Sequence, residues 1–342
     1  MTEEARDPRD VSWHPRRTMI LHGHTAAEQQ LLQAHQSGKL HHAWLLRGPR
    51  GIGKATLAYR FARFLLAVPD PIVAQRKSHL HIDSATGTAR RIAAGAHPDL
   101  LVVERALDVK TMRIKSEIAV ADARAASSFF ARTAGEGGWR VAIVDSADEL
   151  NSESANALLK IIEEPPQRSV FLLISHRPGA LLRTVRSRCI GLDLHPLSND
   201  DTLRVLRDLP PVANQSEEDL RLAAELSNGS PGRGLDLIGS EGAAAFANFK
   251  AKPRLSPARC IEIGMAFAGR DTAADYEVFS ELFIGWIAER ARTAGLSGGG
   301  AALAKAHDDI NYSLRQTDAL NLDRRQTVVD ALLVLGEALK AS

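Results

Sequence analysis

The sequence has few of the residues that cross-link a fold or stack against nucleic-acid bases. It contains two cysteines, Cys189 and Cys260, among 342 residues, and aromatic residues make up 5% of the chain. Two thiols cannot form a disulfide framework or a four-thiolate metal site. The low aromatic content argues against a surface on which bases stack.

A long apolar run and a strong excess of one charge are also absent. No apolar run reaches the roughly 18 residues that a membrane-spanning helix needs. Residues 1–20 are charged and lack the apolar centre of a secretory signal. We therefore expect a mobile leader over residues 1–20 and a cytoplasmic protein without membrane contact. The net charge of +2 is too small to indicate DNA binding by the chain alone, so a DNA contact would need a local patch or a partner.

The first half of the chain alternates short apolar runs with helical patterns, which predicts an α/β layer built on a parallel sheet. The expected strands are Ala43–Leu46, Leu100–Val103, Val141–Asp145, Val170–Ser175 and Ile190–Leu194. The expected helices between them are Lys54–Ala67, Ile114–Ala131 and Ser152–Glu164.

After Leu194 the pattern is helical only. Short helices are expected at Asn199–Arg207, Glu217–Asn228 and Gly232–Gly239, and longer ones at Pro257–Ala268, Ala273–Ala294, Ala301–Thr317 and Asp323–Leu339. We therefore predict an α/β domain at residues 21–195, a small helical domain at 196–245 and an all-α domain at 250–342.

A glycine-rich loop lies between the first expected strand and the helix that follows it. Residues Gly48–Ala55 read GPRGIGKA, which fits the pattern GxxxxGK of a phosphate-binding loop in the required strand–loop–helix setting. Gly48, Gly51 and Gly53 let the backbone N–H groups curl toward phosphate oxygens, and Lys54 adds a positive charge. The pattern predicts ATP or ADP binding, and the setting argues against a plain glycine turn followed by a surface lysine.

Two positions that hydrolysis requires are altered. A Ser or Thr normally follows the lysine and donates its hydroxyl to Mg²⁺, but the chain has Ala55 there, and Thr56 is turned about 100° away. Asp145 ends a strand, as the Mg²⁺-holding aspartate of such enzymes does. The next residue is Ser146, a poor base, where a hydrolysing enzyme would carry a carboxylate. We predict nucleotide binding without efficient hydrolysis and do not expect ordinary Mg²⁺ placement.

Five arginines and no acidic residue lie between Glu164 and Asp193. Most of them are expected on a solvated basic face. Arg188 is different because it directly precedes the last expected strand, and the strand ends of a parallel sheet are where ligands and neighbours are met. The five are Arg168, Arg177, Arg183, Arg186 and Arg188.

Three segments resemble the bacterial clamp-loader subunits of DNA polymerase III, which are AAA+ proteins: NALLKIIEEPP at Asn156–Pro166, FLLIS at Phe171–Ser175 and LLRTVRSRC at Leu181–Cys189. The resemblance covers roughly residues 20–240. It implies an AAA+ P-loop domain, a helical lid domain and an all-α collar that holds a ring together. It also implies that Arg188, in the SRC motif, reaches into the nucleotide site of the adjacent subunit as an arginine finger in trans.

Within that family, the tau/gamma type is the ATP-driven motor, whereas the delta-prime type keeps SRC but has an eroded ATP site. Ala55, Ser146 and the segment NGSPGR at Asn228–Arg233 are similar to the delta-prime type. The resemblance implies a stator in a heteropentamer with delta and tau/gamma subunits, which loads the sliding clamp on primer–template DNA at the replisome. Such a chain would have no independent catalysis, although it would belong to the DNA-directed DNA polymerase III holoenzyme (EC 2.7.7.7).

Two other functions stay open. The intact GxxxxGK pattern would also suit an active ATPase of the tau/gamma type. A DNA-binding module that acts alone is disfavoured by the nearly neutral charge balance.

Further positions have two interpretations each. Ser175 ends a strand and either senses the γ-phosphate or only terminates the strand, and Arg233 is either a second phosphate-sensing arginine or a surface residue. Asp148 and Glu149 are expected to be solvated acids on a loop. Many family members carry a four-cysteine zinc module after the first helix, but residues 68–98 contain no cysteine. That stretch has His79, His81, Asp83 and His97, which we expect to decorate a polar loop without zinc.

Overall fold

The computed structural model describes residues 10–108, 111, 113–269, 271–296, 300–320 and 322–341. The chain divides into two compact units. The first runs to Ala213 and includes Asn228–Arg233, and the second contains Asn214–Ser227 and everything from Gly234 onward. Residues 1–9 of the expected leader lie outside the described residues.

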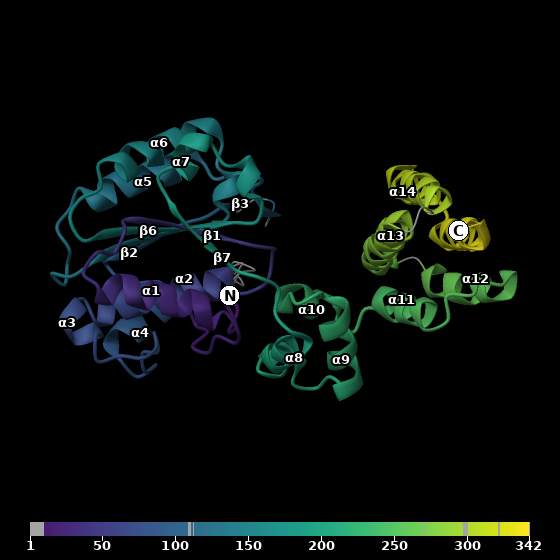
Figure 1. Ribbon diagram of the computed structural model, residues 1–342, viewed down its shortest axis with the longest axis horizontal. Helices are drawn as coiled ribbons and strands as arrows, with labels where there is room; N and C mark the ends of the chain where they lie inside the picture. Colours follow the sequence, from purple (N-terminus) through teal and green to yellow (C-terminus); the bar gives the residue numbers. More distant parts are fainter. Residues whose placement is uncertain are drawn as a thin grey trace, which may run out of the picture. The chain divides into compact units, whose positions relative to one another are not determined.

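The first unit is built on a parallel sheet with the strand order β2-β5-β6-β1-β7 (Figure 1). The strands are β1 (Ala43–Arg47), β2 (Leu100–Val103), β5 (Arg140–Val144), β6 (Ser169–Ser175) and β7 (Ile190–Asp193). A separate antiparallel pair is formed by β3 (Leu107–Asp108) and β4 (Arg113–Ile114). Because all five main strands are parallel, their carboxyl ends lie at one edge of the sheet, and the loops that follow them share that edge.

Helices cover both faces of this sheet, as Figure 1 shows. One face carries α1 (Thr25–Gln36), α2 (Lys54–Ala67), α3 (Pro71–Ala74) and α4 (Gly87–Ala93). The other carries α5 (Val120–Phe130), α6 (Ser152–Glu163) and α7 (Arg183–Arg186). Short 3-10 turns also follow three of the strands or helices: η1 (Ala147–Glu149), η2 (Pro178–Ala180) and η3 (Pro210–Val212).

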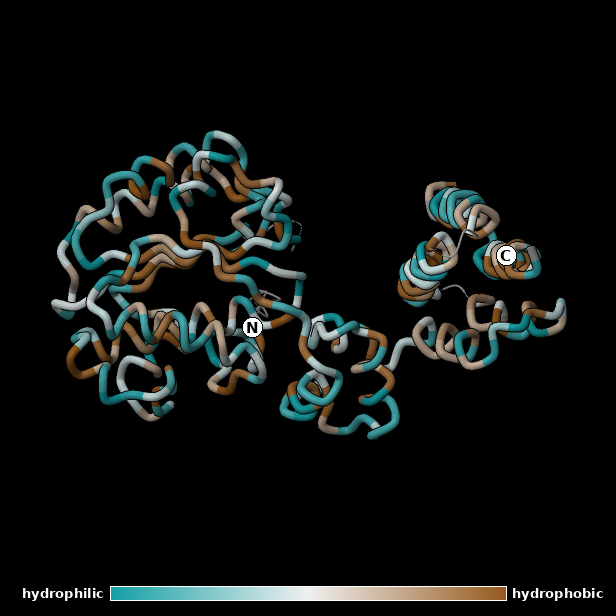
Figure 2. The backbone as a smooth tube through the Cα atoms, in the orientation of Figure 1, coloured by the Kyte–Doolittle hydropathy of each residue, from teal (hydrophilic) through white to brown (hydrophobic). Residues whose placement is uncertain are grey.

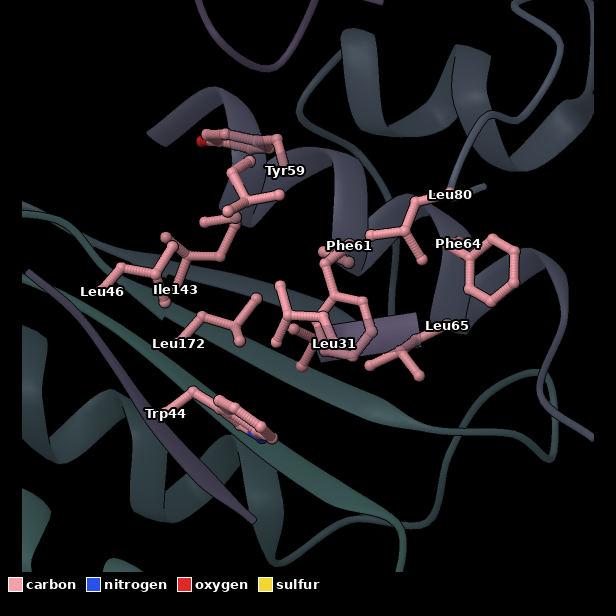
Figure 3. Close-up of a cluster of buried hydrophobic side chains, with 14 of the residues drawn as sticks. Leu31, Trp44, Leu46, Tyr59, Phe61, Phe64, Leu65, Leu80, Ile143 and Leu172 are labelled. Atoms are coloured by element: carbon pink, nitrogen blue, oxygen red, sulfur yellow. The ribbon is translucent and has the colours of Figure 1, made fainter. Parts of the chain in front are cut away.

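Alternate residues of each central strand feed two separate cores, as the period of a β-strand requires. Trp44 and Leu46 join the core under α1 and α2, which Figure 3 shows in close-up. Ala43 and Leu45 join the core under α5 and α6. Burial on both faces explains why these strands read as continuous apolar runs, and the same runs colour the sheet brown in Figure 2.

The rest of the chain is helical. In the first unit α8 (Asn199–Arg207) follows the sheet, and α10 (Pro231–Leu237) starts there and continues into the second unit. The second unit contains α9 (Glu217–Leu226), α11 (Glu241–Ala251), α12 (Pro257–Gly264), η4 (Met265–Phe267), α13 (Ala273–Leu296), α14 (Ala301–Leu320) and α15 (Arg324–Ala341). Of the helices in the described part of the chain, none combines the length and the hydropathy that crossing a bilayer would take.

The fold class predicted from the sequence, a parallel α/β P-loop domain followed by helical parts, is confirmed. The helix expected at Ile114–Ala131 is wrong at its start, because Arg113–Ile114 pairs with β3 and the helix begins only at Val120. Five helices were also missed, namely α1, α3, α4, α7 and α11, and α11 covers the boundary predicted between residues 245 and 250. Phe249 of α11 packs its ring 5.1 Å from that of Phe283 in α13, so the chain on both sides of that boundary is one packed piece.

The described part of the expected leader packs against α2. The guanidinium of Arg63, which is 1% exposed, donates to the carbonyl oxygens of Arg16 at 3.2 Å and Thr18 at 3.4 Å. Arg60 donates to the carbonyl oxygen of Met19 at 2.8 Å. Residues 16–19 are therefore attached to the α/β layer.

Candidate functional site

The phosphate loop has the backbone that its glycines predict. Gly48, Gly51 and Gly53 have φ angles of 150°, 74° and 103°, which side-chain-bearing residues rarely adopt. A Cβ atom at Gly48 would lie 2.3 Å from the carbonyl oxygen of Leu194, and one at Gly51 would lie 2.4 Å from the hydroxyl of Ser230. Only glycine fits these positions, and the loop ends at the N-terminus of α2, where backbone N–H groups are available to an anion.

Lys54, the first residue of α2, is folded back over the loop and is 3% exposed. Its ammonium group donates to the carbonyl oxygen of Gly48 at 2.7 Å and also to that of Pro49. Burial lowers the pKa of Lys54 to about 8, although the nearby carboxylates of Asp145 and Asp148 oppose the shift. The charge needed for phosphate binding is thus present in the loop, in an environment that favours gaining an anionic partner.

Asp145 and Ser146 follow β5 at the same edge of the sheet. Burial raises the pKa of Asp145, and the ammonium of Lys54 opposes this rise. Ser146 has a left-handed backbone, with φ 63° and ψ 57°, and its hydroxyl lies 3.2 Å from Nε2 of His176. The position after the strand-end aspartate therefore holds a neutral hydroxyl bonded to an imidazole. Ala55, the second residue of α2, contributes only a methyl group to the neighbouring core.

The interpretation of Asp148 and Glu149 as solvated acids is wrong. The Asp148 side chain is 1% exposed and accepts a hydrogen bond from the backbone N–H of His176 at 3.0 Å. Burial alone would raise the pKa of Asp148, but the hydrogen bonds it accepts and the nearby imidazole lower it. The Glu149 side chain is 12% exposed and pairs with Arg105 at 2.8 Å. Both acids are buried because η1 turns the chain back over the ends of the strands.

His176 is a site residue that sequence reasoning missed. Burial, followed by the positive charge of Lys54, lowers its pKa to about 4, so the imidazole is neutral at pH 7. Its ring contacts Ser146 and its backbone contacts Asp148, so it links the loops after β5 and β6. A single histidine after a strand carries no distinctive sequence signal, and only its contacts with residues 28 and 30 positions earlier identify it.

Ser175 ends β6 directly beside the end of β1, in register with Arg47. It is fully buried, and its hydroxyl lies close enough to the Asp148 carboxylate to help lower the pKa of that group. The chain leaves β1 toward β2 at one edge of the sheet, whereas it leaves β6 toward β7 at the other edge. Ligands of open α/β sheets bind outside the carboxyl ends of neighbouring strands whose connections run in opposite directions. A buried hydroxyl beside a phosphate loop is a suitable contact for a phosphate oxygen.

The segment Asn228–Arg233 lies against the outside of the phosphate loop. The Ser230 hydroxyl donates to the carbonyl oxygen of Arg50 at 2.8 Å, and the backbone N–H of Gly232 donates to that of Gly51 at 3.0 Å. These contacts use carbonyl groups of the loop and so do not occupy its backbone N–H groups. Half-buried Arg233 is attached to the same segment, since its N–H donates to the Ser230 hydroxyl at 3.3 Å.

Comparisons with known proteins agree with this arrangement. The model of a family described as DNA polymerase III, delta subunit, matches residues 23–198, which is more than half of the chain. The chain belongs to this family. The match begins just before α1 and ends with β7 and the turn after it, so it includes the phosphate loop, Asp145, Ser146 and Arg188.

Several curated relatives match a similar part of this delta-family chain. The DNA polymerase III subunit delta' of Pseudomonas aeruginosa is 36% identical over 206 residues, which are 59% of this chain and 58% of the relative. That of Escherichia coli is 32% identical over 210 residues, 61% of this chain and 58% of the relative. The subunit gamma of Buchnera aphidicola is 28% identical over 229 residues, 66% of this chain and 58% of the relative. The chain therefore spans 58% of the length of these relatives.

Solved structures give looser likenesses. A Thermotoga maritima protein related to the gamma subunit of DNA polymerase III has a TM-score of 0.45 at 15% identity, and covers 90% of this chain and 99% of its own. The Thermotoga maritima RuvB branch-migration motor has a TM-score of 0.42 at 18% identity, and covers 74% of each chain. At these scores the likenesses add nothing to the fold described above.

The structure does not bring Arg188 to the phosphate loop of its own chain. The loop follows the carboxyl end of β1, whereas Arg188 precedes the amino end of β7, and these two strands are parallel neighbours. The whole of β7, roughly 10 Å long, lies between the two levels. The guanidinium of Arg188 is instead 2.8 Å from Glu163 at the end of α6, and both side chains are 40% exposed.

The four residues considered for zinc are not gathered. His79, His81 and Asp83 are exposed, and the two histidine rings are 6.0 Å apart, whereas His97 is buried before β2. Within the described ranges, no three histidine, cysteine, aspartate or glutamate side chains form a set that could hold a metal ion. Cys189 is not activated either, since burial raises the pKa of its thiol to about 12.

Proposed function

We propose that the chain is a delta-prime-type clamp-loader subunit that binds nucleotide, hydrolyses little of it, and contributes Arg188 to the site of a neighbouring subunit. One observation carries the proposal: the phosphate loop is intact, but Ala55 offers no hydroxyl to a metal and Ser146 offers no carboxylate to water. Hydrolysis of a phosphoanhydride depends on placing the metal and the water, so loss of both removes most of the catalysis.

The residues present suit the phosphates of ATP or ADP better than a magnesium ion. The backbone N–H groups of the loop, Lys54 and the hydroxyl of buried Ser175 would contact phosphate oxygens, and Arg233 would approach from the docked segment. Asp145 would be the remaining protein ligand for Mg²⁺. Magnesium, when bound with the nucleotide, supplies charge neutralisation. Without a hydroxyl at Ala55, its attachment to the protein would be weaker.

The position of Arg188 suits action on another subunit. It is 40% exposed and lies at the sheet edge opposite its own phosphate loop. A guanidinium supplied from a neighbour stabilises charge that develops during phosphoryl transfer and raises kcat by about 10³ to 10⁵ in well-studied cases. In this proposal the adjacent tau/gamma-type subunit hydrolyses the ATP and this chain supplies the cation.

In the assembled complex the chain would be a stator within a heteropentamer that contains delta and tau/gamma subunits. The helical second unit would form its share of the collar. Contact with the sliding clamp and with primer–template DNA would come through the complex, at the replisome. The net charge of +2 supports DNA contact through the complex, because the chain by itself offers little electrostatic attraction to DNA.

Reconstitution tests the proposal. The chain would be assembled with the delta and tau/gamma-type subunits of its own source, and the clamp- and DNA-stimulated ATPase would be measured with wild type and with Arg188→Ala. We expect the variant to assemble normally, by native mass spectrometry, and to lower kcat at least about tenfold. Unchanged ATPase in a fully assembled complex would remove Arg188 from the reaction.

A second function is an ATPase of the tau/gamma type, which the intact loop through Lys54 and the similarity to a gamma subunit favour. The purified chain alone distinguishes the two. Turnover near about 1 s⁻¹, at the lower end of ordinary enzyme rates, would support the ATPase. Nucleotide binding by equilibrium dialysis with turnover at background would support the delta-prime-type role.

A further inference from the structure

Arg188 has two partners within its own chain. Its Nη2 lies 2.8 Å from Oε1 of Glu163, and its Nη1 donates to the carbonyl oxygen of Thr184 at 3.0 Å. A guanidinium carries five N–H donors in a rigid plane. Two of its nitrogens thus each have a partner, and the side chain is still 40% exposed.

Both partners are attached to well-packed elements. Glu163 is the last residue of α6, a 12-residue helix that is anchored by buried Leu158 and Ile162 and capped by the Asn151 side chain. Thr184 lies in α7, next to Val185, which is 1% exposed. A long, flexible arginine loses rotamer freedom when it binds a ligand, and fixing it beforehand removes part of that cost.

We propose that Glu163 is a positioning residue, which orients the guanidinium of Arg188 so that its remaining N–H groups face the nucleotide of the neighbouring subunit. This inference rests on the proposed function, in which Arg188 acts in trans. An ion pair with both members 40% exposed contributes little to stability. Its removal is therefore expected to change the reaction and leave the fold almost untouched.

The contact between Glu163 and Arg188 also has the opposite interpretation, and the ATPase measurement distinguishes the two. If Glu163 only held Arg188 away from the neighbour, its neutralisation would free the arginine and raise the ATPase. If Glu163 positions Arg188, neutralisation lowers kcat. Because the arginine acts only as charge develops in the transition state, the KM for ATP is expected to stay the same.

The experiment compares Glu163→Gln with the matched control Glu164→Gln in the reconstituted complex. Glu164 is the next residue, is exposed and forms no ion pair with any described residue. We expect Glu163→Gln to lower the clamp- and DNA-stimulated kcat about twofold to fivefold, the range for an exposed ion pair, and Glu164→Gln to match wild type. Glu163→Asp, which keeps the charge on a shorter side chain, is expected to fall between them.

A double-mutant cycle shows whether the effect passes through Arg188. In the Arg188→Ala background, Glu163→Gln is expected to have no further effect. If Arg188→Ala lowers kcat but Glu163→Gln leaves it unchanged or raises it, the positioning role is wrong while the proposed function stands. If Arg188→Ala itself has no effect, the proposed function fails. An equal loss from Glu163→Gln in both backgrounds would also overturn the inference.

Discussion

Nε2 of His176 lies 3.2 Å from the hydroxyl of Ser146, so an imidazole contacts the residue that follows the strand-end aspartate. The imidazole is uncharged at neutral pH, because its pKa is lowered to about 4. Because His176 is neutral, its contact with Ser146 supplies no negative charge, and the serine hydroxyl stays a poor base toward water. The loops after β5 and β6 are thereby linked through a contact that supports the structure of the site without supplying a carboxylate.

Restoring hydrolysis is expected to require two changes at once. Ala55→Thr would supply a metal hydroxyl and Ser146→Glu a carboxylate, and each alone leaves the other deficiency in place. We expect the double variant to raise the ATPase of the isolated chain at least about tenfold over either single variant, since positioning and charge act together. The left-handed backbone does not prevent Ser146→Glu, because the native serine also has a Cβ atom and already carries that backbone cost.

Steady-state phosphate release with saturating ATP and Mg²⁺ measures this effect. Thr56→Ala in the double variant is the control, because Thr56 is expected to take no part in metal binding. Full activity from Ser146→Glu alone would show that the residue at position 55 does not limit hydrolysis.

Lys54→Met is expected to weaken nucleotide binding at least about tenfold, since it removes the charge on the phosphates. It is also expected to change how stability depends on pH. The pKa of Lys54 is about 8 in the folded chain against 10.5 for an ordinary lysine, so the unfolded chain binds more protons between these values. Stability of the wild type should therefore rise relative to the variant as pH increases from about 8 to about 10.5.

Nucleotide titration followed by fluorescence and urea unfolding at several pH values would check both parts. Lys39→Met, at an exposed position, controls for the loss of a lysine elsewhere. A constant difference between wild type and Lys54→Met across this pH range would mean that the ammonium is not destabilised by burial.

Acid is expected to weaken the site through His176. Its folded pKa of about 4 lies below the ordinary 6.5, so the unfolded chain takes up the proton first as pH falls. The stability that the neutral imidazole provides is complete above about pH 6.5 and is lost progressively toward about pH 4. His176→Gln is expected to lose less stability than wild type between pH 7 and pH 5. Urea unfolding at the two pH values measures this, with exposed His79→Gln as control; equal losses in all three proteins would contradict it.

Substitutions at two glycines distinguish the cost of backbone strain from the cost of close packing. Gly38 and Gly51 have similar φ angles of 68° and 74°, but a Cβ atom at Gly38 meets nothing within 4 Å, whereas one at Gly51 meets Ser230 at 2.4 Å. Gly38→Ala is expected to cost roughly 1 kcal/mol of unfolding free energy from its backbone alone. Gly51→Ala should cost about 1–3 kcal/mol more, because the docked segment must move.

Denaturant unfolding gives the two free energies. Ser230→Ala in the Gly51→Ala background relieves part of the clash and is expected to recover part of the loss. An equal cost at both glycines would show that the Ser230 segment does not press on the loop.

The sequence was most informative where a rule is local. The loop Gly48–Gly53 and the helix Lys54–Ala67 match their predictions residue for residue, since glycine spacing and a following apolar pattern define both. The helix α8 was also predicted with its correct bounds, and the Ser198 side chain caps its N-terminus by accepting from Asp201 at 3.1 Å. These signals need no knowledge of the rest of the fold.

The site residues that sequence reasoning missed depend on contacts far apart in the chain. Asp148 was expected to be solvated because it was placed on the loop after the strand, but the N–H of His176, 28 residues later, donates to its carboxylate. The start of α5 was predicted too early because residues 113–114 pair with residues 107–108. Neither contact leaves a periodic trace, so tertiary pairing overrides local preference at both places.

The phosphate loop and Arg188 lie at opposite ends of the parallel strands, so the α/β layer has a phosphate-loop end and an Arg188 end. In the proposed function, subunits arranged head to tail would place Arg188 of one subunit beside the phosphate loop of the next, through heterologous contacts that either close into a ring or continue as a filament. A subunit that did not hydrolyse its own nucleotide would still supply Arg188 to its neighbour, which would suit it to the end of such a row.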